Sequence, residues 1–340
     1  MTLRGWGGVA AMAVACALTA VFALLLPVTQ QRPSHDGTTS YASGGLVDGR
    51  QVKADDCDPA VKGEEPERSL TPSGSESGDA VRAIKERGHL SVGVDQNSYR
   101  WGYRDPNSTN KKSELEGFDI DLAHEIAGDI LGDRNAVRFR AIPTNERIPA
   151  IQRGEVDMVV RTMTISCERL KDVAFSSAYF QTGQQVLAPK TSDIKGYGAS
   201  LAGKRICTAA SSTAQSSLVE GKKKPVDDGG LPKSTDISTT VPNQLDCLVR
   251  LQLGEVDAVV TDGALAASQA AQDPTVQLKG EPYTKEFYGV AMKKGADDLV
   301  RRVNQVLEDY RESDGWQKSY DHWLKPALGP SDGPPAPKYK

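Results

Sequence analysis

The sequence lacks the features on which several classes of protein depend. Its formal net charge is only −4 over 340 residues and its basic residues are scattered, so nothing indicates a nucleic-acid-binding surface. It has four His and, among five Cys, no CxxC motif, which argues against a metal site. We therefore expect neither a metal nor a cofactor.

Charge is also missing from the start of the chain. After Arg4, an uncharged run extends from Gly5 to Gln31, and its apolar part at residues 6–28 is long enough to cross a bilayer. Arg4 would stay in the cytoplasm, which places the remaining residues outside it. Residues 1–28 are therefore either a cleaved signal sequence or a retained membrane anchor. Lipidation at Cys16 is a third alternative, although the residues before it lack the usual Leu of a lipobox.

The remaining four cysteines are even in number, which in an exported chain indicates disulfides. Three pairings are open. We expect Cys207 to pair with Cys247, because both fall in the second of the two units described next. Cys57 would then pair with Cys167 and tie the leader segment to the first unit.

A repeated pattern organises the rest of the chain. Residues 154–157 and 254–257 both read GEVD, and a Val pair follows shortly after each. Each copy has the form of a helix end, a Gly stop and a short buried strand. Two such copies one hundred positions apart predict two similar α/β units.

Polar side chains follow both repeated strands. Arg161, Thr162 and Thr164 come after the first, with Arg169 a little further on, whereas the second ends at Asp262. Ligands of open α/β sheets bind at the carboxyl ends of the strands. Cations and hydroxyls from one unit and a carboxylate from the other predict a site for a zwitterion, such as an amino acid.

Three other segments carry candidate binding residues. Tyr99 and Trp101 lie in a loop just past a first strand, where they are well placed to cover a small ligand. Arg147 falls in the first turn of a predicted helix, where a cation opposes the helix dipole. The hydroxyl-rich turn at Ser212 and Thr213 leads into another helix, whose free N–H groups form a ready anion site.

Six motifs, taken in their order and spacing, resemble a known family. Residues 88–325 are similar to the extracellular solute-binding proteins of polar amino acid ABC importers, family 3 type, and above all to actinobacterial glutamate- and glutamine-binding proteins. The motifs are Leu90–Val94, Leu115–Leu122, Arg147–Asp157, Thr162–Arg169, Leu201–Arg205 and Val259–Asp262.

The resemblance implies a two-lobed, periplasmic-binding-protein-like α/β fold of type II, whose lobes are joined by two hinge crossovers. Residues 29–78, rich in Ser, Gly, Pro and acidic residues, are predicted to form a flexible extracellular linker. The expected bounds are 79–188 with 284–326 for the first lobe, 189–283 for the second, and 327–340 for a loose, Pro-rich tail.

The resemblance also assigns roles to residues that would hold the α-carboxylate. Arg169 would clamp it with a two-pronged hydrogen bond, and Thr164, Ser212 and Thr213 would add donors. Ser211 departs from the family pattern, because relatives often carry Gly at that position.

The other ends of the ligand have candidates too. Thr162 and Asp262 would receive the α-ammonium group. Arg147 matches an Arg that binders of acidic amino acids place near the side-chain carboxylate, and Arg161 is a second candidate for that role.

The function implied is capture of glutamate, aspartate or glutamine outside the cytoplasm for an ABC importer, by a protein secreted or anchored at the cell membrane. A membrane-anchored sensor that signals to a membrane receptor and kinase is the alternative. Enzymes on the same fold, prephenate-type dehydratases and lytic transglycosylases, need a general acid or base at the cleft. His89, His124 and His322 fall outside the predicted strand-end loops, and Glu168 adjoins Arg169, so we expect no enzyme.

Overall fold

The computed structural model describes residues 57–58, 61, 63–75, 77–105 and 114–340. The predicted signal sequence or anchor at residues 1–28, Cys16, and residues 29–56 of the predicted linker lie outside the described residues. Within the part that is described, no helix combines the length and apolar character needed to cross a membrane.

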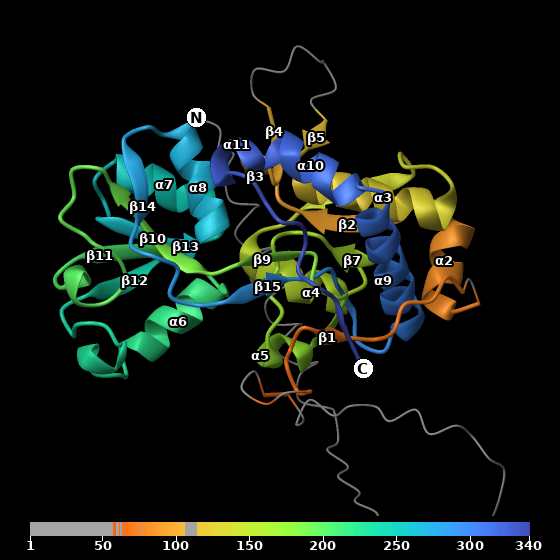
Figure 1. Ribbon diagram of the computed structural model, residues 1–340, viewed down its shortest axis with the longest axis horizontal. Helices are drawn as coiled ribbons and strands as arrows, with labels where there is room; N and C mark the ends of the chain where they lie inside the picture. Colours follow the sequence, from red (N-terminus) through yellow and green to blue (C-terminus); the bar gives the residue numbers. More distant parts are fainter. Residues whose placement is uncertain (1–56, 59–60, 62, 76, 106–113) are drawn as a thin grey trace, which may run out of the picture. The chain divides into compact units, whose positions relative to one another are not determined.

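A five-stranded sheet forms the centre of the first lobe (Figure 1). The first three strands in its order run parallel, and the fourth is antiparallel to both of its neighbours. In that order the strands are β6 (Val137–Ala141), β2 (Leu90–Val94), β7 (Met158–Val159), β16 (Ala291–Lys293) and β8 (Val173–Phe175).

Helices cover both faces of this sheet with apolar side chains. On one face pack α2 (Asp79–Arg87), α3 (Phe118–Leu131), α9 (Asp297–Glu312) and α10 (Gly315–Trp323). On the other face pack the 3-10 turn η2 (Thr144–Glu146), α4 (Arg147–Gln152) and the short α5 (Cys167–Leu170).

The second lobe repeats this arrangement, in which the fourth strand alone runs opposite to the other four. Its sheet order is β12 (Asp236–Val241), β11 (Arg205–Ala209), β13 (Ala258–Asp262), β10 (Gln184–Pro189) and β14 (Val276–Lys279). One face packs against α6 (Thr213–Gly221), and the other packs against α7 (Gln244–Gln252) and α8 (Gly263–Gln272).

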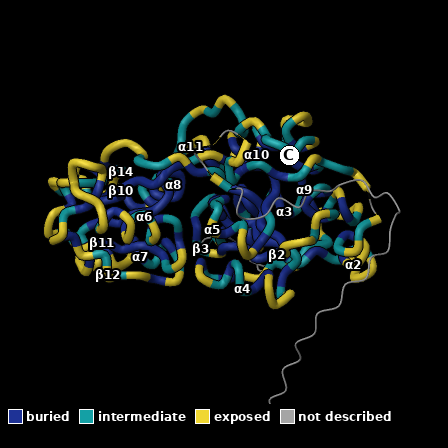
Figure 2. The backbone as a smooth tube through the Cα atoms, turned by 90° about the horizontal axis from the view of Figure 1, so that it is seen from below, coloured by how far each residue is buried: buried dark blue, intermediate teal, exposed yellow. Residues whose placement is uncertain are grey.

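The strands of the sequence repeat, β7 and β13, lie in the middle of their sheets and are buried. Figure 2 shows that buried backbone lies inside both lobes and that exposed backbone lies at their outer edges. Side chains at 158 and 160 join one core of the first lobe, and the side chain at 159 joins the other. Residues 258–260 alternate in the same way between the two cores of the second lobe. The apolar runs in both copies therefore form doubly covered strands, as predicted.

Two crossover strands, β9 (Phe180–Thr182) and β15 (Glu286–Tyr288), connect the lobes and pair antiparallel with each other (Figure 1). The sequence placed the first crossing near Pro189. That position is wrong, because β10 already pairs with β13 and β14 of the second sheet. An apolar strand next to a crossover has the same sequence pattern whichever sheet it joins, so the pattern could not show to which lobe β10 belongs.

The two ends of the described chain meet on the first lobe. Strand β1 (Arg68–Ser69) pairs in parallel with β17 (Lys338–Tyr339). The Ser69 hydroxyl donates to the carbonyl oxygen of Phe175 at 2.8 Å, and the Asn304 amide donates to that of Leu70 at 2.6 Å. Here the structure differs from the expected flexible linker and loose tail. Two-residue strands are too short to show periodicity in the sequence, and the Pro-rich composition gave no indication of a strand.

Both expected disulfides are present. Cys207–Cys247 joins β11 to α7 inside the second lobe, and Cys57–Cys167 joins the segment before β1 to the first turn of α5. The remaining elements are short: β3 (Asn97–Ser98), β4 (Gly102–Arg104) and β5 (Leu115–Glu116) form a small sheet, beside η3 (Ala199–Leu201), η4 (Val226–Asp228) and α11 (Lys325–Leu328).

Candidate ligand-binding cleft

A cleft of about 590 Å³ opens between the segment after β7 in the first lobe and the β11–α6 turn in the second. Small-molecule sites fall in the range of roughly 300–1,000 Å³. Arg147 and Arg169 line it from the first lobe, and Ser211 and Thr213 line it from the second. Segments that follow strand ends of the two lobes thus face one another across a space large enough for an amino acid.

Arg169 is held rigidly at the wall of this cleft. It lies in α5, and its backbone N–H donates to the side chain of Ser166, the N-cap. Its guanidinium donates to the carbonyl oxygen of Thr164 at 2.7 Å and to that of Ser211 at 3.2 Å, so it touches both lobes. Only 7% of the residue is exposed.

Arg147 is still more buried, at 3% exposure, and its partners are all carbonyl oxygens. Nε donates to Thr144 at 3.0 Å, and Nη1 lies 3.3 Å from the oxygen of Arg161 and 3.5 Å from that of Thr162. Burial lowers the pKa of Arg147 well below its ordinary value, and the nearby charges of Arg169 and Arg161 lower it further. An anion in the cleft would relieve this unfavourable concentration of positive charge.

Neither Arg147 nor Arg169 forms a salt bridge with any carboxylate in the described part of the chain. Buried charges in proteins are normally paired, because removing a charge from water without a counter-charge is costly. Two unpaired guanidinium groups on one cleft therefore form a site suited to anionic groups.

The opposite charge comes from the second lobe. Asp262, the last residue of β13, accepts hydrogen bonds from the Tyr288 hydroxyl at 2.5 Å and from the Gln184 amide. Burial raises the pKa of Asp262 to about 7, and the Glu286 carboxylate nearby adds to the increase. A cation placed beside Asp262 would stabilise its ionised form.

A continuous polar network joins Arg169 to Asp262. The hydroxyls of Thr164 and Thr213 both donate to Oε2 of Glu286, at 2.7 and 2.9 Å. The amide of Gln184 then donates to Thr213 at 3.1 Å and to Asp262. The sequence predicted that Arg169 and Asp262 face a shared site. Arg169 lines the cleft, and Asp262 is connected to it through this network without lining the cleft itself.

Two residues beside the cleft have backbone conformations that are unusual for their type. Thr162 has a φ of 40° and Ser211 a φ of 59°, and they lie in the segments that follow β7 and β11. The left-handed region is one that Gly enters without steric cost, whereas residues with a Cβ adopt it less readily. Local strain of this kind persists where the surrounding structure enforces it, and binding sites are common places for it.

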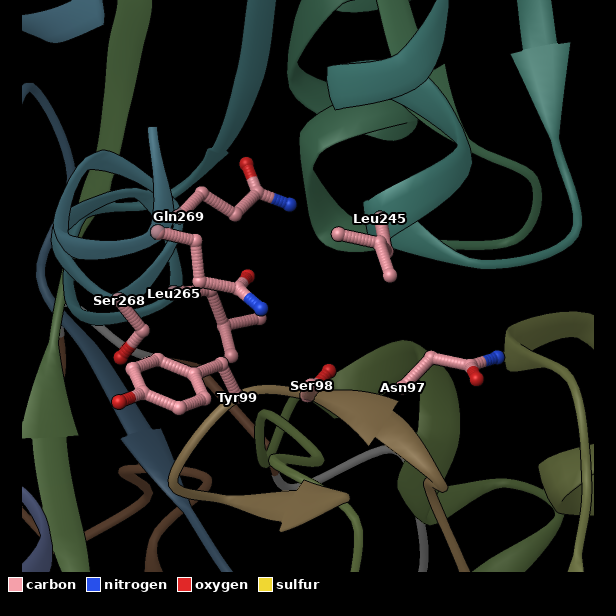
Figure 3. Close-up of a pocket in the computed structure, with 8 residues that line it drawn as sticks. Asn97, Ser98, Tyr99, Leu245, Leu265, Ser268 and Gln269 are labelled. Atoms are coloured by element: carbon pink, nitrogen blue, oxygen red, sulfur yellow. The ribbon is translucent and has the colours of Figure 1, made fainter. Parts of the chain in front are cut away.

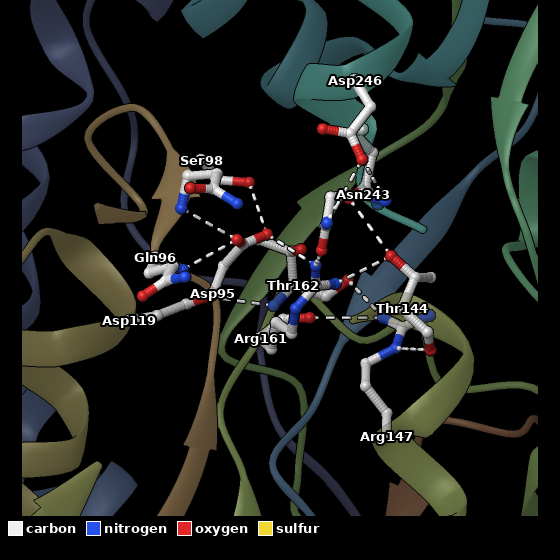
Figure 4. A network of polar contacts seen from close by, with 12 residues as sticks. Asp95, Gln96, Ser98, Asp119, Thr144, Arg147, Arg161, Thr162, Asn243 and Asp246 are labelled. Carbon is white, nitrogen blue, oxygen red and sulfur yellow. Dashed lines mark hydrogen bonds and ion pairs between the residues drawn. The ribbon is translucent and has the colours of Figure 1, made fainter. Parts of the chain in front are cut away.

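Arg161 is not a free cation, which corrects its role as a candidate for the ligand's side chain. It is fully buried and pairs with Asp95 at 2.7 Å (Figure 4). It also donates to the Thr144 hydroxyl at 3.0 Å and, across to the second lobe, to the Asn243 side chain at 3.2 Å. Its charge is used inside the protein to connect the lobes.

Thr162 also has an internal partner. Its backbone N–H donates to Asp119 at 2.9 Å, and the Tyr179 hydroxyl donates to the other oxygen of that carboxylate at the same distance. Burial raises the pKa of Asp119 to about 7, against both hydrogen bonds. The Asp119 carboxylate therefore holds the strand-end turn from behind.

Trp101 and Tyr99 do not line the cleft, which corrects the prediction that they cover the ligand. Trp101 is completely buried in the apolar core, with its ring edge-on to Phe180 and its indole N–H donating to Ser268 at 3.2 Å. Tyr99 lies beside Leu265 and Ser268 at a separate, much smaller pocket (Figure 3). An aromatic residue after a strand has the same sequence pattern in a core as in a lid.

Comparison with known proteins agrees with this geometry. The profile of the bacterial extracellular solute-binding proteins, family 3, matches residues 90–326. The chain belongs to this family. Its members are binding proteins, and in the described residues no cluster of His, Cys, Asp and Glu could hold a metal ion.

Two relatives illustrate the similarity of this family 3 solute-binding protein in sequence. It is 34% identical over 248 residues to the ABC transporter glutamine-binding protein of Bacillus subtilis, covering 73% of this chain and 85% of the relative. It is 29% identical over 252 residues to the glutamate-binding protein of Corynebacterium efficiens, covering 71% and 80%.

Solved structures confirm the predicted two-lobed fold of type II. An ancestral arginine-binding protein bound to glutamine superposes with a TM-score of 0.61 at 33% identity, covering 72% of this chain and 99% of that one. The family match begins at residue 90 and ends at 326, so the paired terminal segments β1 and β17 lie outside it.

The sequence assigned no binding role to three residues that connect to Asp262 or to the cleft residue Thr213. Glu286, Gln184 and Tyr288 lie on or next to the crossover strands. A signal was present, because an acid begins a crossover strand whose other two residues are aromatic. Its meaning depended on knowing that β15 runs past the ends of both repeated strands.

Proposed function

We propose that the protein captures an acidic amino acid, glutamate or aspartate, between its lobes outside the cytoplasm and delivers it to the permease of an ABC importer. The observation that carries this proposal is the pair of buried guanidinium groups, Arg147 and Arg169, which line one cleft without a carboxylate partner among the described residues. A ligand with two carboxylates supplies a counter-charge for each. Its ammonium group is matched by Asp262.

In this proposal Arg169 forms a charge-assisted hydrogen bond with the α-carboxylate, and backbone N–H groups at the Ser212–Thr213 start of α6 are further donors, because the side-chain hydroxyls of Thr164, Ser212 and Thr213 already donate within the protein. The N-terminus of α6 begins at Thr213 with Ser212 as its cap, so the positive end of the helix dipole favours the same anion. Asp262 receives the α-ammonium group.

The choice of an acid over an amide rests on Arg147. It lies on the same cleft as Arg169 but in a different helix, which suits the second carboxylate of a glutamate side chain. The relatives include both a glutamine-binding and a glutamate-binding protein, which supports an amino acid of this size without deciding between acid and amide. These relatives also favour transport over the sensor alternative.

Calorimetric titration of the purified protein with glutamate, aspartate, glutamine and asparagine tests the proposal. We expect dissociation constants near micromolar for the acids, about −8 kcal/mol, and at least tenfold weaker binding of the amides. The temperature of thermal unfolding should rise with ligand concentration, because ligand at a hundred times its dissociation constant stabilises the folded protein by about 2.7 kcal/mol.

Arg147→Gln sharpens the test. The variant should lose the preference for glutamate over glutamine, whereas Arg138→Gln, a change at an exposed residue of β6, should keep it. Equal binding of glutamate and glutamine by the unmodified protein would refute the acidic preference. Absence of any amino acid binding would refute the proposed function itself.

A further inference from the structure

A second acid, which the family resemblance did not assign, is connected to Asp262 through the side chains of Thr213 and Gln184. Glu286 is 9% exposed and lies on β15, the crossover strand that returns to the first lobe. One of its oxygens accepts from Thr164 of the first lobe and from Thr213 of the second. Its other oxygen accepts from Thr284 at 3.2 Å. A single carboxylate thus contacts both lobes and its own crossover.

The region between Glu286 and Asp262 is rich in hydrogen-bond acceptors. The two carboxylates repel each other enough that Glu286 contributes to the raised pKa of Asp262. Gln184, which is fully buried, donates its amide N–H groups to Asp262 and Thr213, and its side-chain oxygen has no hydrogen-bond partner. Buried polar atoms of native proteins rarely lack a partner, so this one requires an explanation.

We propose that Glu286 is a ligand-binding residue that forms, together with Asp262, an acidic pair for the α-ammonium group of the bound amino acid. The inference rests on the proposed function and extends it to a residue on the crossover. An ammonium group carries three N–H donors and one positive charge. It supplies what two neighbouring carboxylates and an unpaired amide oxygen lack.

The position of Glu286 gives this contact a consequence for lobe closure. Thr164 belongs to the first lobe and Thr213 to the second, and their hydroxyl oxygens are 3.5 Å apart. Both donate to Glu286, so the carboxylate is aligned only when the lobes approach each other. A ligand that uses the aligned carboxylate is bound more tightly by the closed arrangement, which is the condition for a ligand to shift a conformational equilibrium.

The competing explanation is that Glu286 only holds the two threonines and never faces the ligand. A pair of ligands separates these roles. Glutarate is glutamate without its α-ammonium group, so a residue that binds the ammonium group matters for glutamate alone. A residue that only shapes the cleft matters for both ligands.

The experiment measures calorimetric affinities for L-glutamate and displacement of glutamate by glutarate, using the unmodified protein, Glu286→Gln and Glu281→Gln. Glu281 is exposed on the same return segment and serves as the matched control. We expect Glu286→Gln to weaken glutamate binding at least tenfold while glutarate displaces more readily, because one negative charge has gone. The control should leave both affinities unchanged, and thermal unfolding should show that each variant folds.

Each outcome has a distinct meaning. The deciding quantity is the affinity for glutarate divided by the affinity for glutamate. If this ratio is no higher in Glu286→Gln than in the unmodified protein, the proposal for Glu286 is overturned. If the unmodified protein binds glutamate and the variant binds it equally well, the proposal also fails while the proposed function stands. If the unmodified protein binds no amino acid, the proposed function fails first.

Discussion

The two lobes use the same joint between helix and strand. Gly154 and Gly254 end the helices α4 and α7 with φ values of 69° and 70°, which Gly adopts without steric cost. Three residues later, Asp157 accepts from the backbone N–H of Ser91 at 2.8 Å, and Asp257 accepts from that of Arg205 at 2.7 Å. Each Asp also pairs with an arginine side chain, so both joints are locked to the neighbouring parallel strand in one way.

The lobes differ where these strands end. The first lobe continues into a turn that presents hydroxyls and cations to the cleft, whereas the second stops at the carboxylate of Asp262. The shared residues build the scaffold, and the residues that differ carry opposite charges. The repeat thus accounts for the scaffold that the lobes share, and the proposed ligand contacts lie where the two copies differ.

The largest expected effect comes from removing either charge. Arg169→Ala and Asp262→Asn should each weaken amino acid binding by roughly 2–5 kcal/mol, enough to abolish it in practice, because the partner charge on the ligand would be buried alone. Calorimetry provides the measurement, and thermal unfolding verifies the fold. Asp193→Asn, at an exposed residue, is the control. Retained affinity in both variants would contradict the opposition of charges between the lobes.

The next prediction compares the loss of the disulfide in one lobe with its loss in the other. Cys57–Cys167 and Cys207–Cys247 close loops with sequence separations of 110 and 40, and loss of either to serine should destabilise by about 2–4 kcal/mol in the chain-entropy model. Urea unfolding measures this. Only the first pair should also weaken ligand affinity, since Cys167 begins the helix that carries Arg169. Weaker ligand affinity after loss of Cys207–Cys247, with unchanged affinity after loss of Cys57–Cys167, would contradict this expectation.

The helix–strand joints at Asp157 and Asp257 allow the same substitution to be compared in the two lobes. Asp157→Asn and Asp257→Asn should each lower the free energy of unfolding by roughly 1–2 kcal/mol, because a charge-assisted hydrogen bond to backbone is weakened at a partly exposed site. Urea unfolding of the two variants should give similar losses with ligand affinity unchanged. Strongly unequal losses would mean that the two joints are similar in sequence but not in energy.

The smallest effect is a dependence on pH. The pKa of Asp262 is raised from 3.8 to about 7. Its ionised form is therefore unfavourable in the free protein, whose stability from this group falls as pH rises from about 4 to 7 and then stays level. A bound ammonium group favours the ionised form, so affinity should rise about tenfold per pH unit below 7 and level off above it.

Calorimetry between about pH 5.5 and 8.5 measures this slope. Asp119 in the first lobe also has a pKa raised to about 7, but it faces Tyr179 and the backbone of Thr162. Asp119→Asn should therefore keep the slope in affinity. If the dependence of affinity on pH disappears in Asp119→Asn, the titrating group is Asp119 of the first lobe and not Asp262.

Much of the fold could be predicted from the sequence, because its signals are local. The Gly stops and the alternating burial of residues 158–160 and 258–260 follow from helix capping and strand periodicity within a few residues. Arg169 and Asp262 could be proposed together for the same reason, since each follows a recognisable strand.

What could not be predicted depends on contacts between distant residues. Arg161 has the sequence position of a ligand cation, but Asp95, far away in the chain, neutralises it. Trp101 has the position of a lid residue, but a core formed by several elements encloses it. Glu286 lies in a connection whose path past both strand ends is fixed only by pairing with β9.

The most direct test of the central claim is a crystal structure of the protein with L-glutamate. The account predicts one glutamate in the cleft, with its α-carboxylate on Arg169 of the first lobe and its ammonium group on Asp262 of the second. A ligand that contacts a single lobe, or that leaves either of these residues without contact, would contradict it.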